Sequence, residues 1–263
     1  DHRDLHSFPT RRSSDLLNGV LGEFAPGQII FTTPHKEKCE KISAQTGVKY
    51  AESNAECANN AKYIILAVKP QMYDVVLKNI ENVITSEKVI ISIAPGITID
   101  SIKGKVGGSV RVVRAMPNTP ALVGEGMTAA CRNEFVTDEE LEGAKKILSA
   151  FGKVEVVSEH LMDVVVSVSG SSPAYVFMLI EAMADAAVSG GMPRKQAYQF
   201  AAQALLGSAK MVLETGMHPG ELKDMVCSPA GTTIEAVRVL EKFGLRSAVI
   251  EAEKVCADMS RNM

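Results

Sequence analysis

The sequence lacks tryptophan and is poor in aromatic residues and cysteine. Its five cysteines are odd in number and widely spaced, with no C-x-x-C pair and no metal-ligand spacing: Cys39, Cys57, Cys131, Cys227 and Cys256. This excludes a disulfide framework and a cysteine-held metal site. Reduced thiols in a cytoplasmic protein are expected.

A strong excess of charge is also missing. Twenty-eight basic and 31 acidic residues give a net charge of -3, without a dense cationic stripe, so we expect no nucleic-acid partner. The most apolar run, residues 175–188, is shorter than the ~20 residues of a membrane helix and contains Glu181 and Asp185, so no membrane is expected. Residues 1–16 have no apolar middle and do not resemble a signal peptide.

Motifs for several kinds of catalysis are absent as well. The chain has no G-x-S-x-G elbow, no H-E-x-x-H pair and no phosphate-binding G-K-S/T. We therefore expect neither a serine hydrolase nor a metal enzyme.

What the sequence does contain is an alternation of strands and helices. Apolar, β-branched runs at 28–33, 61–68, 88–94, 109–116 and 153–157 alternate with helical segments, of which 137–152 opens with a capping box. This predicts an α/β fold, with a Rossmann-like, open parallel sheet in a dinucleotide-binding domain at 1–157. Only helices are expected at 158–263. The helix at 173–191 is apolar almost all round, which predicts burial against a second subunit; a helix wholly buried inside one chain is the alternative.

Polar residues follow three of the predicted strands, where open α/β sheets bind nucleotides. Thr32 and Thr33, followed by His35 and Lys36, stand where NAD enzymes usually carry an acidic residue. Hydroxyls and positive charge suit a 2′-phosphate, so NADP is favoured while NAD remains possible; a simple strand terminator is the alternative. Asn118 lies between two prolines, either aimed at a ligand or part of a rigid turn.

Hydroxyl residues also crowd the start of a predicted helix near residue 232. Ser228, Thr232 and Thr233 surround a Pro-Ala-Gly turn, and the free N–H groups of a helix N-terminus can hold a carboxylate. Plain N-capping is the alternative.

From about residue 17 to the end, the sequence resembles the pyrroline-5-carboxylate reductase family. The segments that carry the resemblance are, in order, AVKPQ, SIAPGI, RVVRAMPNTPALVGEG, SGSSPAYVF and HPGELKDMVCSPAGTTIEAV. The resemblance implies a Rossmann domain followed by an all-α dimerisation domain. It implies reduction of 1-pyrroline-5-carboxylate to L-proline with NAD(P)H, the last step of proline biosynthesis, in homo-oligomers built from intertwined dimers.

The same resemblance implies roles for single residues. Thr233 would assist at the imine nitrogen, and the substrate contacts would be Glu159, Ser228, Gly231 and Thr232. The cofactor contacts would be Asn54, Ala67, Val68, Lys69, Pro70, Ile93, Ala94 and Pro95, beside Thr32, Thr33 and Asn118 from the pattern above. Ser172, Pro95 and Met225 depart from residues common in the family.

The start of the chain departs further. The family begins with a strand and a Gly-rich loop for the pyrophosphate, whereas residues 1–16 contain no glycine and no strand pattern. We therefore hypothesise that residues 1–16 are foreign to the chain. There are two alternatives to an active reductase. The first is a β-hydroxyacid dehydrogenase relative, but residues 163–189 lack the catalytic lysine of that family. The second is an oligomeric homologue that is inactive because it binds the cofactor poorly.

Overall fold

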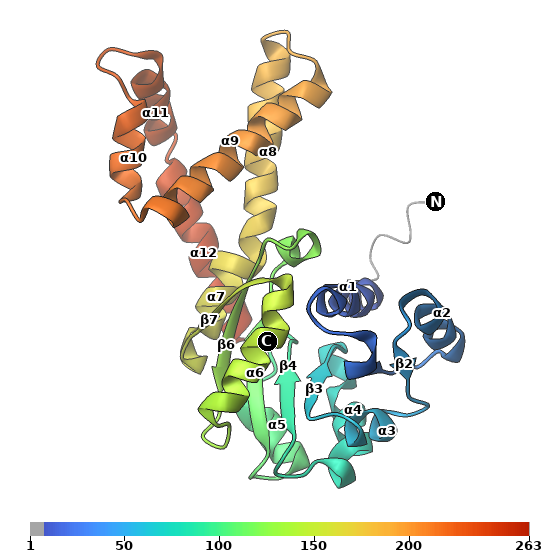
Figure 1. Ribbon diagram of the computed structural model, residues 1–263. Coiled ribbons are helices and arrows are strands. Elements are labelled where there is room, and N and C mark those ends of the chain that lie inside the picture. The colour runs from blue at the N-terminus through green and yellow to red at the C-terminus, as the bar shows by residue number, and fades with distance from the viewer. Residues whose placement is uncertain (1–7, 263) are drawn as a thin grey trace. The chain divides into compact units, whose positions relative to one another are not determined.

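The computed structural model describes residues 8–262, which form two compact units. The first unit runs up to Gly170 and includes the segment from Ala257 onward; the second is Ser171–Cys256. The first unit contains α1 Phe8–Glu23, β1 Ile30–Phe31, α2 Lys36–Thr46, β2 Lys49–Tyr50, α3 Asn54–Asn59, β3 Tyr63–Leu66, α4 Tyr73–Ile80, β4 Val89–Ser92, α5 Ile99–Val106, β5 Arg111–Met116, β6 Gly126–Arg132, α6 Asp138–Leu148, β7 Gly152–Val156 and α7 Met162–Val165 (Figure 1).

The main sheet has the order β3-β4-β5-β6-β7, and β1 pairs with β2 in a separate two-stranded sheet. Every pair of neighbouring strands is parallel except β5 with β6, which is antiparallel. The predicted α/β fold with a Rossmann-like parallel sheet is confirmed, and the antiparallel pair β5–β6 is a detail that the sequence did not predict. The connection at 117–125 is too short for the dozen or more residues that a parallel crossover needs, so the chain turns back.

Alternating side chains of the strands fill two apolar layers, one on each face of the main sheet. Ile64, Ile90 and Val112 belong to the layer that includes residues of α4 and α5. Ile65 and Ile91 point the other way, into the layer that includes residues of α6. Both faces are therefore covered by helices, which explains why the strands read as nearly continuous apolar runs.

Two helix ends predicted from the sequence are confirmed, the start of α6 and the end of α2. Thr137 and Glu140 form the predicted capping box of α6, with Glu140 N–H 3.2 Å from the Thr137 hydroxyl. Helix α2 ends at Gly47, whose φ of 72° is the left-handed conformation that glycine adopts without strain.

Helix α1 is continuous from Phe8 to Glu23. It packs against α6 and the 3-10 turn Ser149–Phe151, and a Cβ on Gly19 would clash with the Phe151 ring. Residues 1–7 lie outside the described part of the chain, and the hypothesis that residues 1–16 are foreign stays a prediction.

The second unit contains only helices over its described residues: α8 Ser172–Ser189, α9 Arg194–Thr215, α10 Pro219–Val226, α11 Thr232–Lys242 and the larger part of α12 Leu245–Arg261. Large apolar side chains of α8 and α9 are exposed, among them Phe177, Met178, Phe200 and Leu213 at 57%, 67%, 62% and 68%. By length and composition, the helical stretch Glu159–Ser189 could cross a membrane, and 11% of its most apolar window is buried. An apolar surface of this kind is typical of a subunit interface.

Candidate functional site

The carboxyl ends of β3 and β4 carry the segments 67–70 and 93–95 that the sequence predicted at a nucleotide. The two strands are parallel and adjacent, so these segments leave the sheet at one edge. Buried Tyr73 ties the two ends together, because its hydroxyl donates to the Leu66 carbonyl at 3.1 Å and shares a 2.9 Å hydrogen bond with the Ser92 hydroxyl. Burial raises the pKa of Tyr73, which keeps this hydroxyl a neutral donor.

The segment after β4 is less accessible than its predicted role suggests. Ile93 and Ala94 are 5% and 4% exposed, and their side chains pack into the apolar layers. Pro95 is half-buried, and Gly96 has a left-handed φ of 73° that turns the chain toward α5. A nucleotide could therefore meet the backbone here rather than the side chains of Ile93 and Ala94.

Of the two threonines after β1, Thr33 makes local bonds within the chain. The Thr33 hydroxyl donates to the His35 carbonyl at 3.1 Å and lies 3.3 Å from the Cys39 sulfur. Exposed Lys36 lies 3.5 Å from a Glu52 carboxylate oxygen, and the pKa of Lys36 is raised chiefly by Glu52. Part of the positive charge expected at a 2′-phosphate is thus already paired. Half-buried Asn54 opens the short helix α3.

Asn118 is occupied at both ends of its amide. Its Nδ2 donates to the Ser169 hydroxyl at 3.1 Å, and its Oδ1 accepts the Met127 N–H at 2.9 Å. These bonds link the turn after β5 to β6 and to the π-helix Val166–Ser171. These internal bonds fit a rigid turn, and the predicted ligand contact of Asn118 stays a prediction.

The hydroxyl-rich segment before α11 forms the predicted helix N-terminus. The cap residue is Gly231, which has no side chain to bond the exposed N–H groups of the first turn, and Thr232 and Thr233 are the first residues of the helix. A Cβ on Gly231 would clash with the Ser228 hydroxyl oxygen. The N–H groups of the first helical turn have no partner inside the helix, so they can receive an anion.

Ala230, directly before this cap, has a φ of 55°. It is the one residue other than glycine with a positive φ among residues 8–262. Left-handed backbone is costly for a residue with a Cβ, so the turn that presents α11 is strained.

Glu159 was predicted on the substrate side, and its carboxylate makes two bonds within the first unit. The oxygen Oε1 accepts from the Arg114 guanidinium at 3.0 Å and from the Ile99 N–H at 2.9 Å. Arg114 is 7% exposed, so this is an ion pair with a buried cation.

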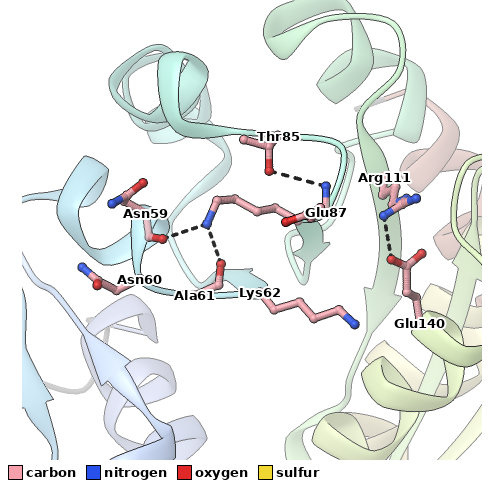
Figure 2. A pocket seen from close by; sticks show the side chains of 9 residues that line it. Asn59, Asn60, Ala61, Lys62, Thr85, Glu87, Arg111 and Glu140 are labelled. Atoms are coloured by element: carbon pink, nitrogen blue, oxygen red, sulfur yellow. Dashed lines mark hydrogen bonds and ion pairs between the residues drawn. The ribbon is translucent and has the colours of Figure 1, made fainter.

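A hollow of about 630 Å³ opens at the opposite, amino end of the main sheet. Its walls include Lys62 before β3, Lys88 before β4, and the Arg111–Glu140 ion pair (Figure 2). Lys88 donates to three backbone carbonyls at 2.8–2.9 Å, so its charge serves the end of α3. None of the predicted site residues lines this hollow. Among the described residues, no cluster of three or more metal-binding side chains occurs.

Tyr73, Arg114 and Ala230 were missed in the sequence. Arg114 could have been noticed, because an arginine inside the apolar run RVVRAM must find a partner if the strand is buried. Ala230 gives no comparable signal, because its φ depends on the turn around it. The role of Tyr73 depends on two strand ends that are 26 residues apart in the chain, Leu66 and Ser92.

The comparisons with known proteins agree with each other. Residues 159–263 match the family model "Pyrroline-5-carboxylate reductase dimerisation", and residues 15–96 match "NADP oxidoreductase coenzyme F420-dependent". Pyrroline-5-carboxylate reductase of Escherichia coli (strain K12) is 53% identical over 250 residues, which cover 94% of this chain and 93% of the relative. The chain belongs to the pyrroline-5-carboxylate reductase family.

Solved structures of the pyrroline-5-carboxylate reductase family share the fold. The enzyme from Coxiella burnetii has a TM-score of 0.89 at 33% identity, covering 95% of this chain and 94% of that one. The enzyme from Plasmodium falciparum, solved with NADP bound, has a TM-score of 0.84 at 31% identity, covering 96% and 94%. The Rossmann-like domain followed by a helical dimerisation domain is therefore confirmed, the dimerisation domain supports homo-oligomerisation, and the β-hydroxyacid dehydrogenase alternative is set aside.

Proposed function

We propose that this chain reduces 1-pyrroline-5-carboxylate to L-proline with hydride from NADPH, in the cytoplasm. The observation that carries the proposal is the start of α11. The strained turn at Ala230, the cap residue Gly231 and three hydroxyl residues lie around the backbone N–H groups of the first helical turn, which have no partner inside the helix. The substrate is an anion with a carboxylate beside a cyclic imine, and a helix N-terminus suits that carboxylate. Relatives that match nearly the whole chain carry the name of this activity.

In the proposed reaction, the imine carbon gains hydride and the imine nitrogen gains a proton that comes from solvent, so the C=N double bond becomes a C–N single bond. Ser228, Gly231 and Thr232 bind the carboxylate through hydroxyls and backbone N–H groups. Thr233 hydrogen-bonds the nitrogen as it receives the electron pair. When bound, the reduced nicotinamide supplies the hydride. Since the reactants carry this chemistry, the protein chiefly positions them and excludes water.

We assign the cofactor to the strand ends described above. The loops at 67–70 and 93–95 share one edge of the sheet, as an open α/β nucleotide site requires, so these residues fit a nicotinamide cofactor. Thr32, Thr33 and Asn54 would face its adenosine end, with NADP favoured over NAD because no acidic residue follows β1 directly. The Lys36–Glu52 pair reduces the strength of that preference.

The pyrophosphate has no comparable place among the described residues. Its usual seat is a helix N-terminus behind a Gly-rich turn, but α1 continues unbroken upstream of Leu16 to Phe8. The backbone N–H groups around Leu16 are therefore used inside the helix. This observation favours the second candidate function, an oligomeric homologue of the family that binds NADPH poorly and does not turn over.

One experiment separates the two candidates. NADPH oxidation with 1-pyrroline-5-carboxylate is followed for this chain and for a version whose residues 1–16 are replaced by a strand and a Gly-rich turn, with NADPH titration by fluorescence alongside. Turnover in both versions supports the reductase without qualification. Turnover and saturable NADPH binding only in the second version support the binding-defective homologue, and turnover in neither overturns the proposed reaction.

A further inference from the structure

One carboxylate oxygen joins three separate segments of the first unit. Glu159 Oε1, in the 3-10 turn Glu159–Leu161, accepts from Arg114 Nη1 of β5 at 3.0 Å and from the Ile99 N–H of α5 at 2.9 Å. These three residues and their two contacts are here called the brace. Ile99 and Glu159 are 60 positions apart in the sequence, so the brace is a tertiary contact rather than a local helix cap.

Ordinary stability does not account for the brace. Arg114 sits between Val113 and Ala115, which are 0% and 1% exposed, and a buried cation requires a partner to offset lost hydration. An apolar residue of similar volume often serves folding as well as a buried ion pair does. Neighbouring Cys131, opposite Arg114 on β6, does not compete for the charge, since burial raises the pKa of its thiol to about 12. The pair therefore points to a requirement for geometry.

The segment that the brace holds is the loop between β4 and α5. Its first end, Ser92, is fixed by the Tyr73 hydroxyl at 2.9 Å. At its other end, α5 begins with Thr98 as N-cap, whose hydroxyl accepts the Ser101 N–H, and the next N–H group, that of Ile99, donates to Glu159. Only residues 93–98 lie between these anchors.

A matched contact exists at the other end of the same strand. Glu140 accepts from Arg111 Nη1 of β5 at 2.8 Å (Figure 2). It also accepts from the Thr137 N–H at the start of α6 at 3.0 Å. Its side chain is 8% exposed, so this pair is also partly buried. It has the same chemistry as the brace but holds no predicted cofactor segment, which makes Glu140 the control for Glu159.

We propose that Arg114 and Glu159 are positioning residues of the reductase: through the Ile99 N–H they fix the 93–98 loop against which the nicotinamide cofactor lies. The inference rests on the proposed function and gives Glu159 a role different from the substrate contact that the family resemblance implies. If Glu159 touched the substrate, its loss would weaken substrate binding. If it positions the loop, its loss weakens cofactor binding, and loss of Arg114 has the same effect.

The test compares Glu159→Ala and Glu159→Gln with Glu140→Ala and Glu140→Gln in the full chain and in the version with the replaced start. We expect Glu159→Ala to raise KM for NADPH about tenfold, the scale of a lost charged hydrogen bond, with KM for the pyrroline substrate changed less than twofold. Glu159→Gln keeps an acceptor oxygen and should recover part of this loss. The Glu140 variants should leave both KM values within twofold.

Hydrogen exchange supplies a readout that needs no turnover. In Glu159→Ala, and in the second variant Arg114→Met, amide exchange should accelerate at least fivefold over residues 93–99, while the Glu140 variants leave that segment unchanged. A rise in KM for the pyrroline substrate alone, unchanged exchange at 93–99, or equal effects of the Glu140 variants would overturn the proposal. If neither unmutated version turns over, the proposed function fails, and the exchange comparison still decides whether the brace holds the loop.

Discussion

Replacing Ala230 with glycine should stabilise the protein. The φ of 55° at Ala230 lies in the left-handed region, where a residue with a Cβ loses about 1–2 kcal/mol. Glycine removes that cost but makes the unfolded chain more flexible, which lowers the free energy of unfolding by about 0.4–1 kcal/mol. The two effects leave a net gain centred on about 0.8 kcal/mol. For a chain of this length, the gain corresponds to a rise in Tm of about 2 °C.

The assay is thermal unfolding of both proteins by calorimetry at one protein concentration, because an oligomer's Tm depends on concentration. Ala236→Gly is the matched control, since Ala236 is an exposed residue within α11. There the same change should cost about 1 kcal/mol. A lower Tm for Ala230→Gly, comparable with that of the control, would refute the argument that this turn stores backbone strain.

Three further outcomes test the site and its surroundings. Thr233→Ala should lower kcat about 10- to 100-fold if its hydroxyl meets the imine nitrogen, with the helical content in circular dichroism unchanged. Gly231→Ala should lower Tm and weaken binding of proline, measured by calorimetric titration, because its new Cβ would clash with the Ser228 hydroxyl at a cost of about 1–3 kcal/mol. Burial raises the pKa values of Cys57 and Cys131 to about 11 and 12, so a thiolate-dependent reagent should modify neither at pH 8 until denaturant is added; rapid modification of the native protein would contradict this.

Much of the fold was predictable because its signals are local. The apolar runs at 61–68 and 88–94 contain β3 and β4, and the capping box at Thr137 marks the start of α6. The direction of β6 was not predicted, since it depends on how the turn after β5 closes. That turn is held by Asn118, which bonds Met127 and Ser169. These partners are 9 and 51 positions further along the chain.

The candidate site was predictable to a smaller degree. The start of α11 could be recognised because its hydroxyl residues and glycine are consecutive in the sequence. At Thr33 and Asn118, where the sequence suggests ligand contacts, the hydroxyl and the amide also bond the chain itself. A polar side chain at a strand end can serve either purpose, and the choice depends on neighbours that only the folded chain brings together.

Residues whose type conflicts with their place proved more informative than residues that fit it. Arg114 is a cation in a buried strand, and Ala230 has a Cβ in a conformation suited to glycine. Each conflict costs stability, and each lies beside a segment assigned to a reactant: the 93–98 loop through Ile99, and the start of α11. Positioning reactants requires such fixed geometry, because a reaction whose chemistry resides in cofactor and substrate is accelerated by their alignment. If alignment is the protein's main contribution, then removing the charge of Arg114 or the backbone strain at Ala230 should change reaction rate or cofactor affinity more than it changes stability.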